Sequence, residues 1–268
     1  MLHKTVQLAS GTVHYWINEL RSERRTLLFT HGLAANHEMF EKQVEFFGAD
    51  FNVITWDVPL HGLSRPYRGF SYADCAQRMK QILDAESVGK VVLVGMSMGG
   101  YPSQEFASRF PQLVDGFVGI DTTPFGLSYY SRADIRILER VGAMAKWFPA
   151  QTLRKSMANS VSRTEYSRQL MFRMLAPLSK AEIVEQMDIA YGEFIKENHD
   201  VAFNFPVLLL VGEHDKTGKV KHYNQQWAAK TGYPLIVIEG AAHLSNCDNP
   251  EAVNRAIEGF VRSLPAKT

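Results

Sequence analysis

Short apolar runs and helical patterns alternate along most of the chain. Eight runs rich in Val, Ile and Leu predict strands at residues 5–8, 12–18, 26–30, 52–56, 91–95, 113–120, 207–211 and 234–238. The patterns between them predict helices at residues 39–47, 72–86, 100–110, 220–230 and 250–263. Near-continuous apolar strands separated by helices are typical of a parallel sheet covered on both faces. We therefore expect an α/β protein with a mostly parallel, eight-stranded sheet flanked by helices.

One segment breaks this alternation. Residues 124–204 contain no convincing strand, but helical runs occur at residues 135–148, 164–175 and 180–197. The segment is rich in Met and aromatic residues, most of which we expect to fill its own small core. Ligands of open α/β sheets bind outside the carboxyl ends of the strands, so a minority should line a pocket there. We interpret 124–204 as a helical insertion after the sixth strand, with residues 1–123 and 205–268 forming the core.

The composition of the chain mainly excludes classes of protein. The 268 residues are 46% hydrophobic and 21% charged, and the net charge is +1, which gives no electrostatic indication of binding to nucleic acid or to an anionic membrane. Two cysteines, Cys75 and Cys247, do not make a disulfide framework. The first residues lack the apolar stretch of a signal peptide, and no run approaches the ~20 apolar residues of a membrane span. We expect a soluble cytoplasmic protein without a membrane span. A homodimer that pairs through the insertion is compatible with the sequence.

The most informative stretch is Gly95-Met96-Ser97-Met98-Gly99. It follows a predicted strand and opens a predicted helix, and a serine on such a sharp turn is strained with its hydroxyl exposed above the sheet. A Cβ at the flanking glycines would clash with the neighbouring strand and helix. The helix also directs unpaired N–H groups at this point. Ser97 is therefore a candidate nucleophile.

With this turn in place, the chain resembles the α/β-hydrolase superfamily, specifically its serine-nucleophile branch with a helical cap. The resemblance runs from the first strands to the last helix and places the insertion in the position of the cap. Five motifs carry it in the family's order: His31-Gly32-Leu33, Asp57-Val58-Pro59-Leu60-His61-Gly62-Leu63-Ser64, Gly95-Met96-Ser97-Met98-Gly99-Gly100, Gly212-Glu213-His214-Asp215 and Gly240-Ala241-Ala242-His243. One departure is Leu60, where relatives more often have glycine, so we expect a slightly different turn there.

The resemblance implies a role for each residue of the site. His243, in the loop after the last strand, is the expected base, and Asp215, after the strand at 207–211, is the expected acid. Asp121 is the alternative acid, because some relatives place theirs after the sixth strand. The backbone N–H groups of Leu33 and Met98 are the expected oxyanion donors. Neither a cofactor nor a metal ion is implied.

Asp248 lies five residues after His243. For this residue we expect a helix-capping role, or one that supports the site from outside.

The expected reaction is acyl transfer to water. A serine at position 97 argues against the dehalogenase and epoxide-hydrolase branches, which use aspartate there. We expect hydrolysis of a small carboxylic ester, lactone or thioester with an apolar portion. Three alternatives stay open: a C–C bond hydrolase of a ring-cleavage dienoate, with Arg132, Arg136 or Arg154 holding the substrate carboxylate; a cofactor-free perhydrolase or haloperoxidase; and a ligand-binding receptor of the same fold.

Overall fold

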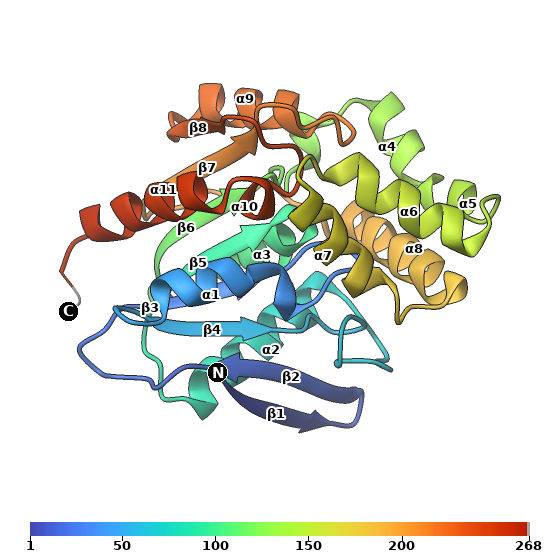
Figure 1. The fold of residues 1–268 in the computed structure, drawn as a ribbon. Coiled ribbons are helices and arrows are strands. Elements are labelled where there is room, and N and C mark those ends of the chain that lie inside the picture. Colours follow the sequence, from blue (N-terminus) through green and yellow to red (C-terminus); the bar gives the residue numbers. More distant parts are fainter. Residues whose placement is uncertain (267–268) are drawn as a thin grey trace.

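The computed structural model describes residues 1–266 and contains one eight-stranded sheet with the order β1-β2-β4-β3-β5-β6-β7-β8 (Figure 1). The strands are β1 (Leu2–Leu8), β2 (Gly11–Ile17), β3 (Thr26–Thr30), β4 (Asn52–Trp56), β5 (Val91–Met96), β6 (Val114–Ile120), β7 (Val207–Gly212) and β8 (Leu235–Ile238). β1 pairs antiparallel with β2, and β2 pairs antiparallel with β4. Every other pair is parallel. The expected fold class is confirmed.

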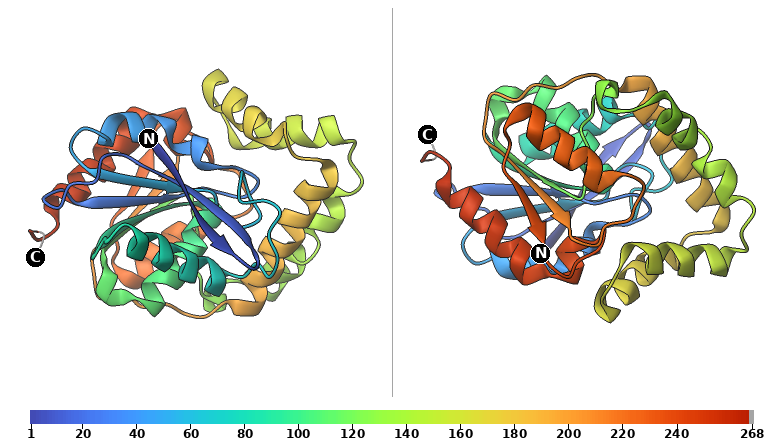
Figure 2. Two further views of the ribbon diagram at one scale, coloured as in Figure 1. Left: turned by 90° about the horizontal axis from the view of Figure 1, so that it is seen from below. Right: turned by 90° about the horizontal axis from the view of Figure 1, so that it is seen from above.

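Helices cover both faces of this sheet (Figures 1 and 2). α1 (Glu41–Phe47) and α11 (Pro250–Ser263) lie on one face, and α2 (Tyr72–Ala85), α3 (Gly100–Arg109) and α9 (Val220–Thr231) lie on the other. Alternate residues of a strand point to opposite faces, so Leu27 and Phe29 of β3 belong to one core and Leu28 to the other. Burial on both faces explains why the central strands are apolar at nearly every position. Shorter elements are η1 (His37–Phe40), η2 (Ser97–Gly99), η3 (Pro111–Leu113) and α10 (Ser245–Asp248).

The segment between β6 and β7 is helical and lies at the carboxyl ends of the parallel strands (Figure 1). Its elements are η4 (Leu127–Tyr129), α4 (Arg132–Leu138), α5 (Val141–Ala145), α6 (Ala150–Val161), α7 (Glu165–Leu175) and α8 (Lys180–Glu197). The continuous helix predicted over 135–148 is wrong, because a turn at residues 139–140 separates α4 from α5. Gly142 lowers helix propensity near this turn, and Pro149 starts a new helix as the N-cap of α6. Within residues 1–266, none of the helices has the length and apolar character needed to cross a bilayer.

Candidate active site

Ser97 occupies the turn between β5 and α3, and its backbone is left-handed, with φ 50°. The turn is possible because its neighbours are glycines. A Cβ on Gly95 would lie 2.7 Å from the Gly100 Cα, and one on Gly99 would lie 2.1 Å from the Thr30 carbonyl oxygen. The clash expected from the sequence is thus confirmed, and the backbone fixes the position of the serine.

Ser97, His243 and Asp215 form one hydrogen-bonded chain, although each comes from a different loop. The His243 Nε2 atom lies 2.8 Å from the Ser97 Oγ atom, and the His243 Nδ1 atom lies 2.9 Å from an Asp215 carboxylate oxygen. A carboxylate only accepts, so Nδ1 carries the proton and Nε2 is left to accept from the serine. The Thr217 N–H group donates to the other Asp215 oxygen at 2.8 Å and holds the acid in place.

Burial and charge act in opposite directions on this pair. Burial alone lowers the pKa of His243, but the charge and hydrogen bond of Asp215, with the charge of Asp121, outweigh it and raise the pKa above 6.5. Burial alone raises the pKa of Asp215, but contact with His243 outweighs it and lowers the pKa below its usual value. The pair therefore favours a charged imidazole, as a base that receives the serine proton requires.

Asp121, the alternative acid, is fully buried and makes different contacts. One of its oxygens accepts from the Gly212 N–H group at 2.7 Å, and the other accepts from the N–H and hydroxyl groups of Ser245 at 3.1 and 2.5 Å. Burial raises the pKa of Asp121 to about 7. Its carboxylate thus joins the end of β7 to the loop of His243, while Asp215 makes the hydrogen bond to the imidazole.

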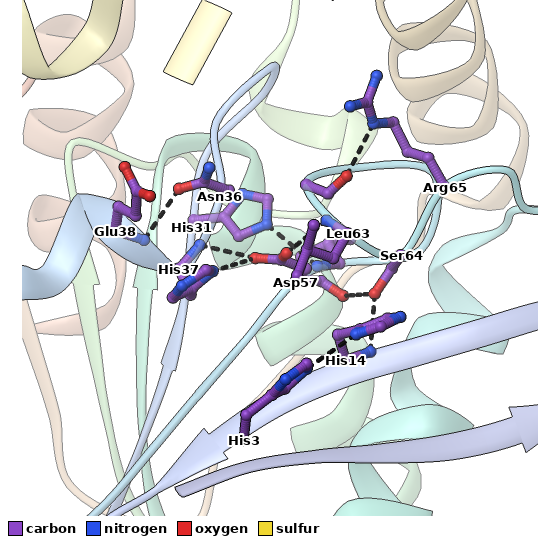
Figure 3. Close-up of polar contacts among 12 residues, drawn as sticks. His3, His14, His31, Asn36, His37, Glu38, Asp57, Leu63, Ser64 and Arg65 are labelled. Atoms are coloured by element: carbon purple, nitrogen blue, oxygen red, sulfur yellow. Dashed lines mark hydrogen bonds and ion pairs between the residues drawn. The ribbon is translucent and has the colours of Figure 1, made fainter. Parts of the chain in front are cut away.

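Leu33 lies in the loop after β3. Polar contacts join this loop to the loop after β4 (Figure 3). The Asp57 carboxylate accepts from both the N–H and the ring Nδ1 of His37 at 2.8 Å, and from the Leu63 N–H group at 2.6 Å. The His31 Nε2 atom accepts from the Val58 N–H group at 3.0 Å. These contacts fix the two loops relative to each other. Leu33 and Met98 both line the same cavity as Ser97.

Leu60, the departure noted in the sequence, has φ 71°, the left-handed region that glycine adopts most easily. Its carbonyl oxygen accepts from the Gln186 side chain of α8 at 2.8 Å. The turn that relatives often build with glycine is therefore strained here, and a contact from the insertion supports it.

A cavity of about 490 Å³ opens above Ser97 and His243. The insertion provides much of its wall, including apolar side chains of α4, α5 and α8, and tyrosines are frequent around it. The lining residues outside the loops already described are Tyr72, Tyr101, Thr123, Tyr130, Asp134, Ile137, Leu138, Val141, Ala190, Tyr191, Thr217, Gly218, Lys219, Val220 and Tyr223. Such a site suits a small molecule with an apolar portion.

This geometry fits the comparisons with known proteins. The sequence model of the "alpha/beta hydrolase fold" family matches residues 25–250. The chain belongs to the α/β-hydrolase family. It is an enzyme of that family, a hydrolase, as the resemblance of its motifs implied.

Proteins similar to this α/β hydrolase are named for several different reactions. It is 27% identical to the 2-(acetamidomethylene)succinate hydrolase of Mesorhizobium japonicum, with 88% of this chain and 87% of that protein covered. It is 24% identical to 3-oxoadipate enol-lactonase 2 of Acinetobacter baylyi, with 90% of each covered. The crystal structure of bromoperoxidase from Bacillus anthracis superimposes with a TM-score of 0.80 at 20% identity, covering 98% of this chain and 100% of that one. This structural likeness shows the shared fold.

The sequence did not identify the hydrogen-bond partners of Asp248. The Asp248 carboxylate accepts from the N–H groups of Arg163 and Thr164 at 2.8–3.1 Å, and from the Ala242 N–H group at 2.9 Å. It therefore ties the start of α7 to the residue before His243. The expected capping role is not observed, because Thr164 is the N-cap of α7 and Asn249 is the N-cap of α11; Asp248 instead supports the loop of His243 from outside. The spacing from His243 was the only signal in the sequence.

The charged residues in the cavity wall also differ from those expected. Arg132, Arg136 and Arg154 are not among the lining residues, and Arg154 donates to the Leu178 carbonyl oxygen instead. Lys219 and Asp134 line the cavity, and their side chains form an ion pair with an N–O distance of 2.7 Å. This pair connects the insertion to the start of α9.

Proposed function

We propose that this hydrolase cleaves a small carboxylic ester, lactone or thioester through an acyl-enzyme. Ser97 is the nucleophile, His243 the general base and Asp215 the acid that orients the imidazole. One observation carries the proposal: the hydrogen-bonded chain from Ser97 through His243 to Asp215 ends in an apolar cavity of about 490 Å³. A serine hydroxyl becomes a good nucleophile only when such a base can take its proton.

In the first step, the Ser97 Oγ atom attacks the substrate carbonyl carbon while its proton moves to the His243 Nε2 atom. The oxyanion that forms is stabilised by the N–H groups of Met98 and Leu33. The His243 proton then passes to the leaving alcohol, and the C–O bond breaks. Water, deprotonated by His243, attacks the acyl-enzyme and releases the acid and free Ser97. Asp215 keeps its charge throughout and stabilises the imidazolium.

The lining of the cavity favours a substrate whose acyl or alcohol part is apolar and uncharged. Its charged wall residues, Lys219 and Asp134, neutralise each other, and the remaining polar groups are mainly hydroxyls. In the C–C bond alternative Arg132, Arg136 or Arg154 would hold the substrate carboxylate, but none of them is among the lining residues, and Lys219, which lines the cavity, is paired with Asp134. We propose ester or lactone hydrolysis ahead of that alternative for this reason. In this proposal the core comprises residues 1–123 and 205–268, and the insertion, residues 124–204, forms the cap.

Steady-state turnover of matched substrates tests the proposal. A panel should contain p-nitrophenyl acetate and butyrate, an aliphatic lactone and a ring-cleavage dienoate, each with wild type and Ser97→Ala. We expect wild type to hydrolyse an ester or lactone with a higher kcat/KM than the dienoate, and Ser97→Ala to lose at least about 10⁴-fold in rate. Preference for the dienoate, or equal turnover by Ser97→Ala, would contradict the proposal.

A further inference from the structure

The first helices of the insertion carry a net positive charge that the small net charge of the whole chain does not reveal. Residues 132–155 contain six basic and two acidic residues and therefore have a net charge of +4, whereas the entire chain has +1. Arg132, Arg136, Arg140 and Lys155 are exposed, and within residues 1–266 none of these four forms an ion pair. A basic surface therefore lies on α4, α5 and α6.

Large apolar side chains are exposed in the same segment. Trp147 is 88% exposed, Ile137 is 58%, Met144 is 52% and Phe148 is 47% exposed. Trp147 and Phe148 lie on the tight turn between α5 and α6, just before Pro149. Figures 1 and 2 show these helices at the outer edge of the molecule, away from the sheet. Four large exposed apolar side chains within twelve residues mark this segment as a candidate interaction surface.

We propose that α4, α5 and α6 bind an anionic lipid bilayer, with Trp147 and Phe148 inserted among the headgroups. Segments that expose Trp or Phe together with Lys or Arg are typical of proteins that lie in the membrane interface. Tryptophan prefers this depth because its ring is amphipathic. Each Lys or Arg near an anionic surface adds to the attraction, and the same segment exposes four cations that form no ion pair within residues 1–266.

The charge argues against a second copy of the chain as the occupant. A twofold interface brings the same patch of both copies together, so two segments of charge +4 would face each other. An anionic bilayer has the complementary charge and requires no matching groove.

The proposed contact also lies next to the candidate active site. Ile137, Leu138 and Val141 belong to α4 and α5, and they line the cavity above Ser97. A bilayer bound to these helices would therefore face one wall of the cavity. The inference rests on the exposed surface and does not depend on the roles proposed for the triad.

Vesicle sedimentation tests the proposal with the full chain. Wild type is mixed with vesicles of phosphatidylcholine, or of equal parts phosphatidylcholine and phosphatidylglycerol, at low and high NaCl. We expect at least ten-fold stronger partitioning to the anionic vesicles, and weaker partitioning in high salt. Trp147→Ser/Phe148→Ser and Arg136→Glu/Arg140→Glu should each weaken it about ten-fold or more.

Matched controls are Val237→Ser, which removes an apolar side chain that is 48% exposed on β8, and Arg255→Glu, which reverses an exposed charge on α11. Both should bind vesicles like wild type, and thermal unfolding should show that all variants are folded. Three results would overturn the proposal: no binding of wild type to anionic vesicles, equal losses in the controls, or a wild-type dimer in light scattering that Trp147→Ser/Phe148→Ser converts to monomer. The last result would identify the patch as a contact between copies.

Discussion

The carboxyl edge of the sheet and the helical insertion meet at one cavity but are built differently. Of the five non-glycine residues with positive φ in the described chain, four follow successive strands of the core: Ala34 after β3, Leu60 after β4, Ser97 after β5 and Asp121 after β6. The fifth, Ser87, lies between α2 and β5. Within residues 124–204, the described backbone contains no such residue. Each strained residue costs roughly 1–3 kcal/mol and persists only where its surroundings fix it. Strain is therefore concentrated where the proposed chemistry needs accurate geometry.

The insertion differs in packing as well. Every residue of α4 is at least partly exposed, and the exposed apolar side chains described above lie on α4, on α5 and on the turn before α6. Accurate positioning of the reacting groups thus comes from the sheet edge, while the insertion supplies a wall and an outer surface.

The first prediction concerns the two carboxylates of the sheet edge. Asp215→Asn should lower kcat by about 10⁴-fold, because the amide cannot stabilise the imidazolium and favours the wrong tautomer. Asp121→Asn should lower kcat only about ten-fold, because it weakens hydrogen bonds to Ser245 without touching the imidazole. Steady-state kinetics with the best ester of the panel measures both. A larger loss for Asp121→Asn would make Asp121 the acid.

The second prediction compares glycines of the two regions. Gly99→Ala should destabilise the fold by about 3 kcal/mol or more, since its Cβ would lie 2.1 Å from a backbone oxygen of Thr30. Gly192→Ala, in the middle of α8, meets no atom within 4 Å and should stabilise the protein by roughly 0.5–1 kcal/mol. Urea unfolding monitored by circular dichroism measures both free energies. Equal effects would show that the sheet edge is no more constrained than the insertion.

The third prediction concerns the connection between the regions. Asp248→Asn should lower kcat/KM about ten-fold, because loss of hydrogen bonds worth about 1–3 kcal/mol frees the loop of His243. Asn249→Ala is the matched control: it removes the N-cap of α11 and should cost about 1 kcal/mol of stability with kcat/KM unchanged. If both variants lose activity in proportion to stability, Asp248 does not position the base.

The smallest expected effect is on pH dependence. The base works only when neutral, so kcat/KM should fall as the pH drops through the pKa of His243. Because neighbouring carboxylates raise that pKa above 6.5, the midpoint of the acidic limb should lie above pH 6.5. Asp121→Asn removes one of these charges and should move the midpoint to lower pH. Initial rates between pH 5 and 9 give the profile, and a midpoint below 6.5 in wild type would oppose this account.

Much of the sheet edge could be predicted from the sequence. Parallel strands end at the same edge, so residues that follow β5, β7 and β8 had to lie near one another, and Ser97, Asp215 and His243 do. Each also lies in a short motif that contains glycine, which indicates a tight turn.

The insertion was less predictable because its contacts are long-range. Asp248 meets Thr164, 84 residues away, and Lys219 meets Asp134, and neither pairing has a local signature. Periodicity located helical segments but did not resolve the turn at 139–140, because Leu138, Glu139 and Arg140 are all good helix formers. The net charge of the whole chain likewise gave no indication of the basic cluster at 132–155. Only the folded structure shows that this cluster is exposed.

The central claim is that Ser97 is an activated nucleophile, and covalent labelling tests it most directly. Wild type and Ser97→Ala are incubated with a small fluorophosphonate, and the intact mass of each is measured. We predict one adduct per wild-type chain and none on Ser97→Ala, because only a serine whose proton can pass to His243 attacks phosphorus quickly. A folded wild type without an adduct, or an equal adduct on Ser97→Ala, would contradict the claim.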